Sequence, residues 1–464
     1  MRRLDRFGGV LMVALAVGPL AKMVRADDAA AAPTAAPTPK TLEDRVKDLE
    51  SKVDQSNPAA TLGVSIHGLV AVDYLYDLNA PSKSPANGLS QPFLRTFENE
   101  KNSFILNEGN LHFERVSDTM PGFVVDLALG KTGDVVNNAT YFGRHTTDTN
   151  DPNGGSIPTT GNGTDFFDAT QFYLTYTVPV GSGIKLKAGR FVTLAGAEVI
   201  KAYNNFNYNV TNSILFGFAI PFTHTGLMAS YAFTDQVSLD MGIVNGWDTV
   251  VDNNDGKSLH SGITIAPDPK FTFYQTVTYG PEQTGQFVPN TVNGSCGSNP
   301  NGPSCNPNLE LYVHPGLSKR LLLTSLITIK PIDPLTFIID YDYGNDSNSV
   351  PVNGLLRTAQ WNGAAAYAIY NFTDSLSGCL RAEVFDDMNG ARVLGPAEGH
   401  PTGGAGTAAT YYEFTPTLTY KIIDGLYWRN EYRHDESDTK KVFAHETAPV
   451  HGQDTLATEL LYAF

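Results

Sequence analysis

Ten histidines are the residues of this 464-residue sequence best suited to acid–base or metal chemistry. Four of them, His67, His112, His224 and His434, fall within or beside segments that we expect to be strands. None stands in a G-x-S-x-G nucleophile motif, and the sequence contains no H-E-x-x-H or C-x-x-C motif. We therefore expect no catalytic residue, no metal and no cofactor, and we interpret these histidines as polar wall residues.

Two segments near the end of the sequence carry both signs of charge at alternating positions. The first contains Arg381 and Glu383, and the second contains Arg429, Glu431 and Arg433. On the inner wall of a closed sheet, such side chains can line the narrowest part of a water-filled channel. The same spacing also fits ion pairs between adjacent strands that never contact a solute, so both interpretations stay open here.

An acidic stripe and one arginine complete the set of candidate wall residues. The stripe consists of Glu108, Asn110, His112 and Glu114. Arg190 is out of phase, because strict alternation places it on the same face as Ala188. A bulge at Gly189 would turn the arginine inward.

The elements that must position these side chains are strands, because apolar and polar residues alternate with a period of two from Leu62 onward. The stretch "PLTFIIDYDYG", for example, separates its large apolar residues from its aspartates. Each face stays unmixed over about ten residues, the length that a tilted strand needs to cross a bilayer. We predict sixteen strands, at 62–78, 104–116, 122–133, 167–179, 183–193, 222–233, 236–247, 258–266, 270–280, 320–330, 334–344, 358–371, 375–388, 410–422, 425–437 and 454–464.

The connections between these strands alternate between short and long. Short ones such as "PVGSG", "APDP" and "IIDG" are rich in residues that favour turns. An even strand number with short turns at one end and long loops at the other is typical of a bacterial outer-membrane barrel. A soluble sandwich also alternates, but the sequence contains no helical element between its hairpins and ends on an aromatic strand, "QDTLATELLYAF". We expect that strand to pair with the first one and face lipid up to Phe464.

The N-terminal region has a different composition. Residues 1–26 combine early arginines with a short apolar stretch and "VRA", which predicts a signal peptide. Residues 27–40 are rich in Ala, Pro and Thr and predict a linker. Residues 41–56 contain two heptads, which favour a short self-associating coiled coil over a solvated amphipathic helix. The predicted fold is thus all-β, a 16-stranded antiparallel transmembrane β-barrel over 62–464 with a short N-terminal coiled-coil helix.

Charge and cysteine content limit the remaining possibilities. A formal net charge of -16 argues against nucleic acid as a partner, because binding phosphates needs clustered Lys and Arg. Cys296 and Cys305 lie nine positions apart in "SCGSNPNGPSC", and we expect a disulfide between them after export, the alternative being two free thiols. Cys379 has no obvious partner.

The whole mature chain resembles a bacterial outer-membrane general porin, and "KAGRFVTLAGAEVI...FGFAIPFTHTG" is similar to the OmpL-like beta-barrel porin family. The resemblance implies an outer-membrane channel, without enzymatic activity, for passive diffusion of small hydrophilic solutes and ions. It also implies a homotrimer, which the N-terminal heptads would assist. The alternative is a surface adhesin or receptor that uses the long extracellular loops.

The connection from Leu194 to Pro221 suits neither an exposed loop nor a strand, because it mixes many apolar residues with polar ones. We expect it to fold back against the inner wall, with its polar side chains toward the channel. In porins of this size the third long connection is the constriction loop, so the resemblance implies the same role here. The alternatives are that it covers the extracellular mouth or packs on a neighbouring subunit. The predicted constriction residues are Glu198, Lys201, Asn204 and Asn207 from this connection, and Arg381, Glu383, Arg429, Glu431 and Arg433 from the strands.

Overall fold

The computed structural model describes most of the region after residue 62. The described residues are 63–79, 95–98, 100–117, 120–139, 167–254, 256–282, 286–289, 310–313, 318–352, 355–393, 408–438, 441–443, 445 and 450–464. The chain divides into two units, residues 1–56 and 57–464. The predicted signal peptide, linker and helix, and also Cys296 and Cys305, lie outside the described residues.

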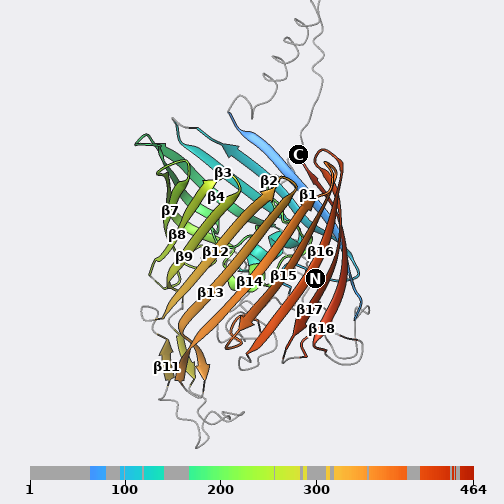
Figure 1. The fold of residues 1–464 in the computed structure, drawn as a ribbon. Helices are drawn as coiled ribbons and strands as arrows, with labels where there is room; N and C mark the ends of the chain where they lie inside the picture. The colour runs from blue at the N-terminus through green and yellow to red at the C-terminus, as the bar shows by residue number, and fades with distance from the viewer. Residues whose placement is uncertain are drawn as a thin grey trace, which may run out of the picture. The chain divides into compact units, whose positions relative to one another are not determined.

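Sixteen strands of the described residues form one closed antiparallel barrel (Figure 1). In chain order they are β1 (Ser65–Asp77), β2 (Phe104–Arg115), β3 (Gly122–Leu129), β4 (Phe167–Val178), β5 (Ile184–Val192), β6 (Thr223–Ala232), β7 (Val237–Val244), β8 (Ser258–Asp268), β9 (Phe271–Pro281), β12 (Lys319–Ile332), β13 (Leu335–Val352), β14 (Leu355–Asn371), β15 (Leu376–Asp387), β16 (Ala409–Ile423), β17 (Leu426–Ser437) and β18 (Gly452–Ala463). Each pairs with its neighbours in chain order, except that β9 pairs directly with β12. The predicted sixteen-stranded barrel is therefore confirmed.

The last residue closes the barrel, as the sequence predicts. Strand β18 pairs with β1, and the backbones of Phe464 and Gly68 exchange two hydrogen bonds of 2.9 Å. The Phe464 ring lies over Gly68, where an added Cβ would come within 2.4 Å of the ring. A larger residue at this position would therefore displace the terminal aromatic ring from its place over the strand.

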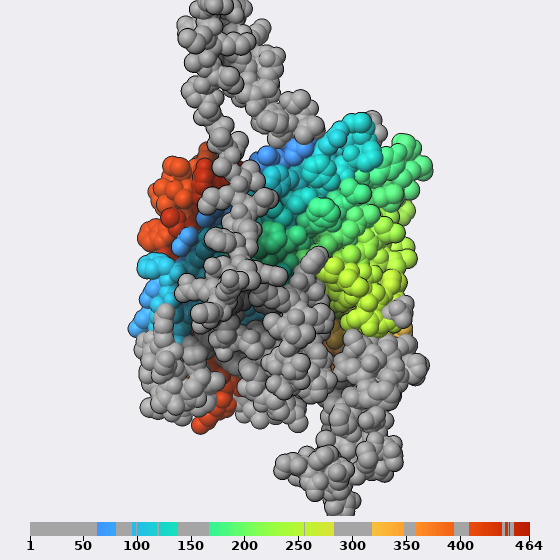
Figure 2. Space-filling model, turned by 180° about the vertical axis from the view of Figure 1, so that it is seen from behind, coloured from blue at the N-terminus to red at the C-terminus, as the bar shows by residue number. Residues whose placement is uncertain are grey.

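The alternation of the strands separates a polar interior from an apolar exterior. In β13, Phe337 and Tyr341 are 39% and 43% exposed, whereas Asp340 and Asp342 are 3% and 0% exposed. Figure 2 shows the outer wall from β1 in blue to β9 in yellow-green, where large apolar side chains such as Leu227 are exposed. The apolar faces thus point outward, which is the opposite of a soluble sandwich.

Two helical elements correct the expectation that no helix lies between the hairpins of the barrel. The third strand is predicted to reach residue 133, but it ends at Leu129, and α3 (Lys131–Ala139) follows. Gly130 lies between them with φ +90°, a backbone conformation that favours glycine and ends the strand. A short π-helix, η1 (Leu215–Ala219), lies in the connection between β5 and β6.

Two further features lie in the connections. Strands β10 (Gln286–Pro289) and β11 (Glu310–Val313) form a separate two-stranded sheet in the connection between β9 and β12. Strand β13 extends past its predicted end to Val352, and β14 begins at Leu355, before its predicted start. Among the described residues, no helix has the length and apolar character required to cross a membrane.

Candidate functional site

The connection between β5 and β6, residues 193–222, lies inside the barrel, and we call it the inner segment. Its two ends meet, because the Thr193 N–H donates to the Phe222 carbonyl at 3.0 Å. Near its start, the Ala197 N–H donates to the Asp340 carboxylate at 2.8 Å. Asp340 belongs to the inner face of β13, so the segment crosses from the β5–β6 side to the opposite wall.

Carboxylates of the strands accept hydrogen bonds from the backbone of the inner segment. Glu431 on β17 accepts from the N–H groups of Val210 and Thr211, at 2.6 and 3.1 Å. Glu383 on β15 accepts from those of Ile214 and Leu215, at 2.6 and 3.2 Å. Each carboxylate therefore accepts hydrogen bonds from two consecutive backbone N–H groups that are not bonded within a strand or a helix.

Guanidinium groups of the same strands bind the carbonyl groups of the segment. Arg381 donates to the Thr211 carbonyl at 2.7 Å, and Arg429 donates to the Asn207 carbonyl at 2.6 Å. Arg433 donates to the Asn212 carbonyl. Together with the carboxylates, these arginines supply the hydrogen bonds that an irregular backbone inside a barrel requires.

The strand charges also pair with one another across adjacent strands. Arg381 binds Glu413 on β16 at 2.8 Å, and Arg429 pairs with Glu459 on β18. The cross-strand ladder left open by the sequence is therefore present, and the same side chains hold the inner segment. They are almost fully buried: Arg381 is 0% exposed, and both Arg429 and Arg433 are 1% exposed.

The charged side chains of the inner segment join this network. Glu198 pairs with Arg381 at 2.6 Å and also accepts from the Tyr367 hydroxyl at 3.1 Å. Lys201 pairs with Glu459 at 2.9 Å. Burial by itself lowers the pKa of Lys201, but the carboxylate of Glu459 outweighs this effect and raises the pKa. Lys201 is therefore charged at neutral pH and held at the β18 wall.

The apolar residues of the segment pack into the largest buried cluster of the described residues. Leu215, Phe216 and Phe218 of η1 contribute to this cluster. The Trp361 indole N–H on β14 donates to the Ala219 carbonyl at 3.1 Å. The apolar residues of the segment are thus buried in this cluster and not exposed to water as they would be in a loop.

A second connection, between β1 and β2, contacts the inner segment. The Phe97 ring lies 5.5 Å from the Phe216 ring, measured between centroids. Arg95 binds Asp435 on β17 at 2.8 Å, and Glu98 accepts from the Asn212 N–H at 3.0 Å. The stretch "PFLRTFENEK" in this connection mixes apolar and charged residues as the inner segment does, and this mixture is the signal from which its role could have been predicted.

Glu98 provides a prediction about pH. Burial raises the pKa of its carboxyl group, although the cations Lys201, Arg433 and Arg95 oppose the rise. The folded protein therefore binds this proton more tightly than the unfolded chain does. The proton on Glu98 therefore contributes to the free energy of unfolding below the unfolded pKa of about 4.3. This contribution is lost as pH rises through the folded pKa of Glu98. Glu98→Gln keeps this position neutral at every pH.

We expect the wild type and Glu98→Gln to unfold at similar temperatures near pH 4, and the wild type to unfold at a lower temperature near pH 8. Circular dichroism of both proteins in the same detergent measures the difference, and effects common to both proteins cancel. A difference that does not vary with pH would show that Glu98 keeps the same charge in the folded and unfolded states.

The structure brings most of the predicted constriction residues together. Glu198, Lys201, Asn207, Arg381, Glu383, Arg429, Glu431 and Arg433 are all buried within the network between the segment and the wall. Asn204 differs, because its side chain is exposed at the tip of the segment. Tyr203, which precedes it, stacks on His67 of β1 with ring centroids 4.2 Å apart. The tip therefore reaches β1 while the body of the segment lies against β13–β18.

The wall opposite this network was not singled out from the sequence. Register places Lys187 on β5, Asp240 on β7 and Tyr274 on β9 on the inner face, and each is partly exposed. The alternation of these strands was the signal that could have identified them. The acidic stripe also faces inward, and its His112 binds Asp126 on β3 at 2.7 Å.

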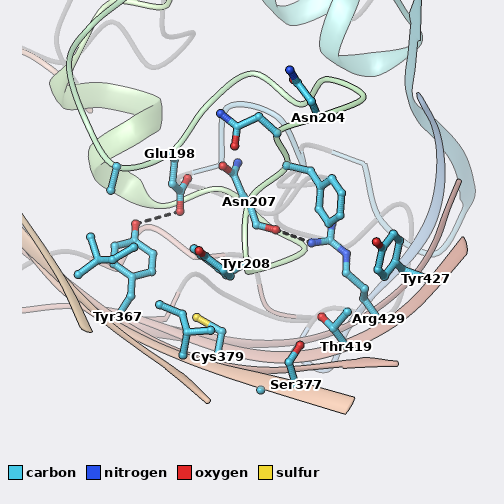
Figure 3. Close-up of a pocket in the computed structure, with 16 residues that line it drawn as sticks. Glu198, Asn204, Asn207, Tyr208, Tyr367, Ser377, Cys379, Thr419, Tyr427 and Arg429 are labelled. Carbon is cyan, nitrogen blue, oxygen red and sulfur yellow. Dashed lines mark hydrogen bonds between the residues drawn. The ribbon is translucent and has the colours of Figure 1, made fainter. Parts of the chain in front are cut away.

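A cavity of ≈ 350 Å³ lies between the tip of the inner segment and strands β13–β17 (Figure 3). Ser377 and Tyr427 stand at the starts of β15 and β17, just after short turns, so the cavity lies toward that end of the barrel. Tyr208 and Phe206 enter it from the segment. Among the described residues, no group of three or more His, Cys, Asp or Glu side chains is arranged to hold a metal ion.

Comparison with solved structures identifies similar barrels. Pseudomonas putida OprB, in a high-pH structure, aligns with a TM-score of 0.50 and 10% sequence identity, covering 89% of this chain and 97% of that chain. The outer membrane channel DcaP of Acinetobacter baumannii aligns with a TM-score of 0.48 and 13% identity, covering 86% and 97%. The likeness to OprB shows the fold alone. A search of curated proteins finds no match.

The sequence also matches a family model over residues 63–464, which includes every strand of the barrel. The family is described as "Putative beta-barrel porin-2, OmpL-like". The matched residues form the closed sixteen-stranded barrel, and its outer wall exposes large apolar side chains as a membrane barrel requires. The chain therefore belongs to the OmpL-like beta-barrel porin-2 family and is a channel protein of the bacterial outer membrane.

Proposed function

We propose that the protein is a porin through which small hydrophilic solutes and ions diffuse passively, and that the inner segment narrows its channel. The observation that carries this proposal is the network of backbone hydrogen bonds from Glu383, Glu431 and the three arginines. A segment held at this many points occupies a fixed part of the lumen. The passage then lies between the segment and the β5–β12 wall.

Recordings from planar lipid bilayers test this function. The purified protein should produce stepwise conductance openings in KCl, because a barrel of sixteen strands is wide enough for a water-filled channel. Liposome swelling should admit small sugars and exclude larger ones. The absence of any opening from correctly folded protein would contradict the proposal and favour a receptor that uses the long loops.

Cations should pass somewhat more readily than anions. The formal net charge is -16, and the arginines of the network are paired with carboxylates. Charge along a narrow aqueous path concentrates counter-ions, and Glu114 and Asp240 are partly exposed carboxylates of the inner wall, Glu114 lying 3.4 Å from His112. Lys187 on the same wall opposes the effect. Reversal potentials in a KCl gradient measure the preference, which Glu114→Gln with Asp240→Asn should reduce, and anion selectivity of the wild type would contradict this prediction.

We also propose a homotrimer, in which residues 41–56 contribute a second contact beside the barrels. Light scattering in mild detergent should give the mass of three chains. A monomer would contradict the trimer, and loss of the trimer only after deletion of residues 41–55 would identify the predicted coiled coil as the main contact.

A further inference from the structure

The cavity between the inner segment and β13–β17 contains two charged side chains, and both are fully engaged elsewhere. Glu198 binds Arg381 and accepts from the Ser213 N–H at 2.9 Å. Arg429 pairs with Glu459 and donates to the Asn207 carbonyl. A charged ligand entering the cavity would therefore meet no unpaired opposite charge to compensate its lost hydration.

Neutral polar groups remain available in the cavity. They are the side chains of Asn205, Tyr208, Ser377, Thr419 and Tyr427, and among the described residues none of them has a side-chain hydrogen bond. Figure 3 shows Ser377 and Thr419 on the strand wall and Tyr208 above them on the inner segment. Hydroxyl and amide groups both donate and accept hydrogen bonds, so the cavity matches a ligand that also does both.

Aromatic rings provide the second component of the cavity. The Tyr208 side chain is 49% exposed, and the rings of Phe206 and Tyr427 lie 5.3 Å apart between centroids. Exposed rings beside unpaired hydroxyl groups favour a ligand with apolar C–H faces and polar edges. A purely apolar ligand would leave the hydroxyl groups without partners.

We propose that this cavity is a binding site for a small, neutral, polyhydroxylated solute of about the size of a monosaccharide. The volume of ≈ 350 Å³ lies at the lower end of the range for small-molecule sites, which begins at about 300 Å³. Tyr208 contacts one face of the solute, while Ser377 and Thr419 bind its hydroxyl groups from the strand wall. This inference rests on the proposed function, since the solute is one that the channel would pass.

Isothermal titration calorimetry of the detergent-solubilised protein tests the site without requiring conduction. Glucose is the neutral probe, and gluconate is the charged probe of similar size. Glucose should bind saturably and more tightly than gluconate. Tyr208→Ala should raise the dissociation constant for glucose about tenfold, because it removes both a ring contact and a hydroxyl partner.

Two further variants make the test specific. Ser377→Ala combined with Thr419→Val should also weaken glucose binding severalfold, without changing the inner segment. Tyr420→Ala is the matched control, because Tyr420 follows Thr419 on β16 but faces outward and is 47% exposed. This control should bind glucose as the wild type does. The shift in electrophoretic mobility on heating confirms that each variant is folded.

The outcomes separate this inference from the proposed function. No saturable glucose binding, or tighter binding of gluconate, overturns the site even if the protein conducts ions. Equal binding by the wild type, Tyr208→Ala and the Ser377/Thr419 variant also overturns it. Saturable binding that depends on these residues, in a protein that shows no conductance, supports the site while contradicting the channel function.

Discussion

Deletion of Ala202–Asn212 should raise the single-channel conductance by about twofold or more, because it removes the tip and the middle of the inner segment from the lumen. The deletion also removes the carbonyl groups that Arg429 and Arg433 bind and the N–H groups that Glu431 binds. These side chains would then be hydrated in a wider channel. Liposome swelling should admit larger sugars than the wild type does.

A smaller change at the tip provides the control. Tyr203→Gly with Asn204→Gly shortens only the side chains of the turn and leaves the network of the segment intact, since Glu383, Glu431 and Arg381 bind residues further along. We expect a measurable but smaller rise in conductance. Unchanged conductance in a folded deletion variant would show that the narrowest point lies elsewhere in the lumen.

The strands were predictable from the sequence because their signal is local. Alternation and turn residues placed all sixteen strands and the pairing of the last strand with the first, and their bounds agree within a few residues except that β13 runs on to Val352. A sheet whose two faces meet lipid and water needs a strict period of two. The same requirement explains why the inward face of β13 could be identified from its aspartates.

The elements that were missed break this local pattern. The predicted third strand continues past Gly130 to residue 133, yet the positive φ of that glycine ends β3 and α3 begins. Arg190 is buried and binds Asp168 at 3.0 Å, although the register of β5 and β6 keeps it on the same face as Ala188. The expected bulge at Gly189 is wrong, because β5 pairs with both neighbours without a shift, and the irregularity lies in the pairing of β3 with β4.

The network around the inner segment could be predicted only in part. The sequence indicated that the segment is inside and that the strand charges point inward. It could not indicate that Glu431 accepts from Val210, because the two residues are 221 positions apart and no local pattern joins them. Carboxylates that bind backbone N–H groups have the same spacing as carboxylates that line water, so burial distinguishes the two roles and alternation does not.

Arg381→Ala should destabilise the folded barrel by roughly 3–5 kcal/mol, the usual cost of leaving a buried charge without its partner. The guanidinium joins Glu198 at 2.6 Å, Glu413 at 2.8 Å and the Thr211 carbonyl at 2.7 Å. Its removal leaves two buried carboxylates uncompensated and releases the middle of the inner segment. Thermal unfolding followed by circular dichroism measures the loss.

Trypsin provides an independent measure of the released segment. Lys201 is 4% exposed in the folded protein, so cleavage after it should be slow in the wild type and much faster in Arg381→Ala. Leu380→Ala is the matched control, because Leu380 is the adjacent residue of β15, faces outward and is 40% exposed. Arg381→Lys keeps the charge but loses the forked geometry, and we expect it to fall between the two. Arg381→Ala could instead have the same unfolding temperature and the same rate of cleavage after Lys201 as the Leu380→Ala control. The remaining contacts of Glu383, Glu431 and Arg429 would then be sufficient to hold the segment, and Arg381 would not be its central anchor.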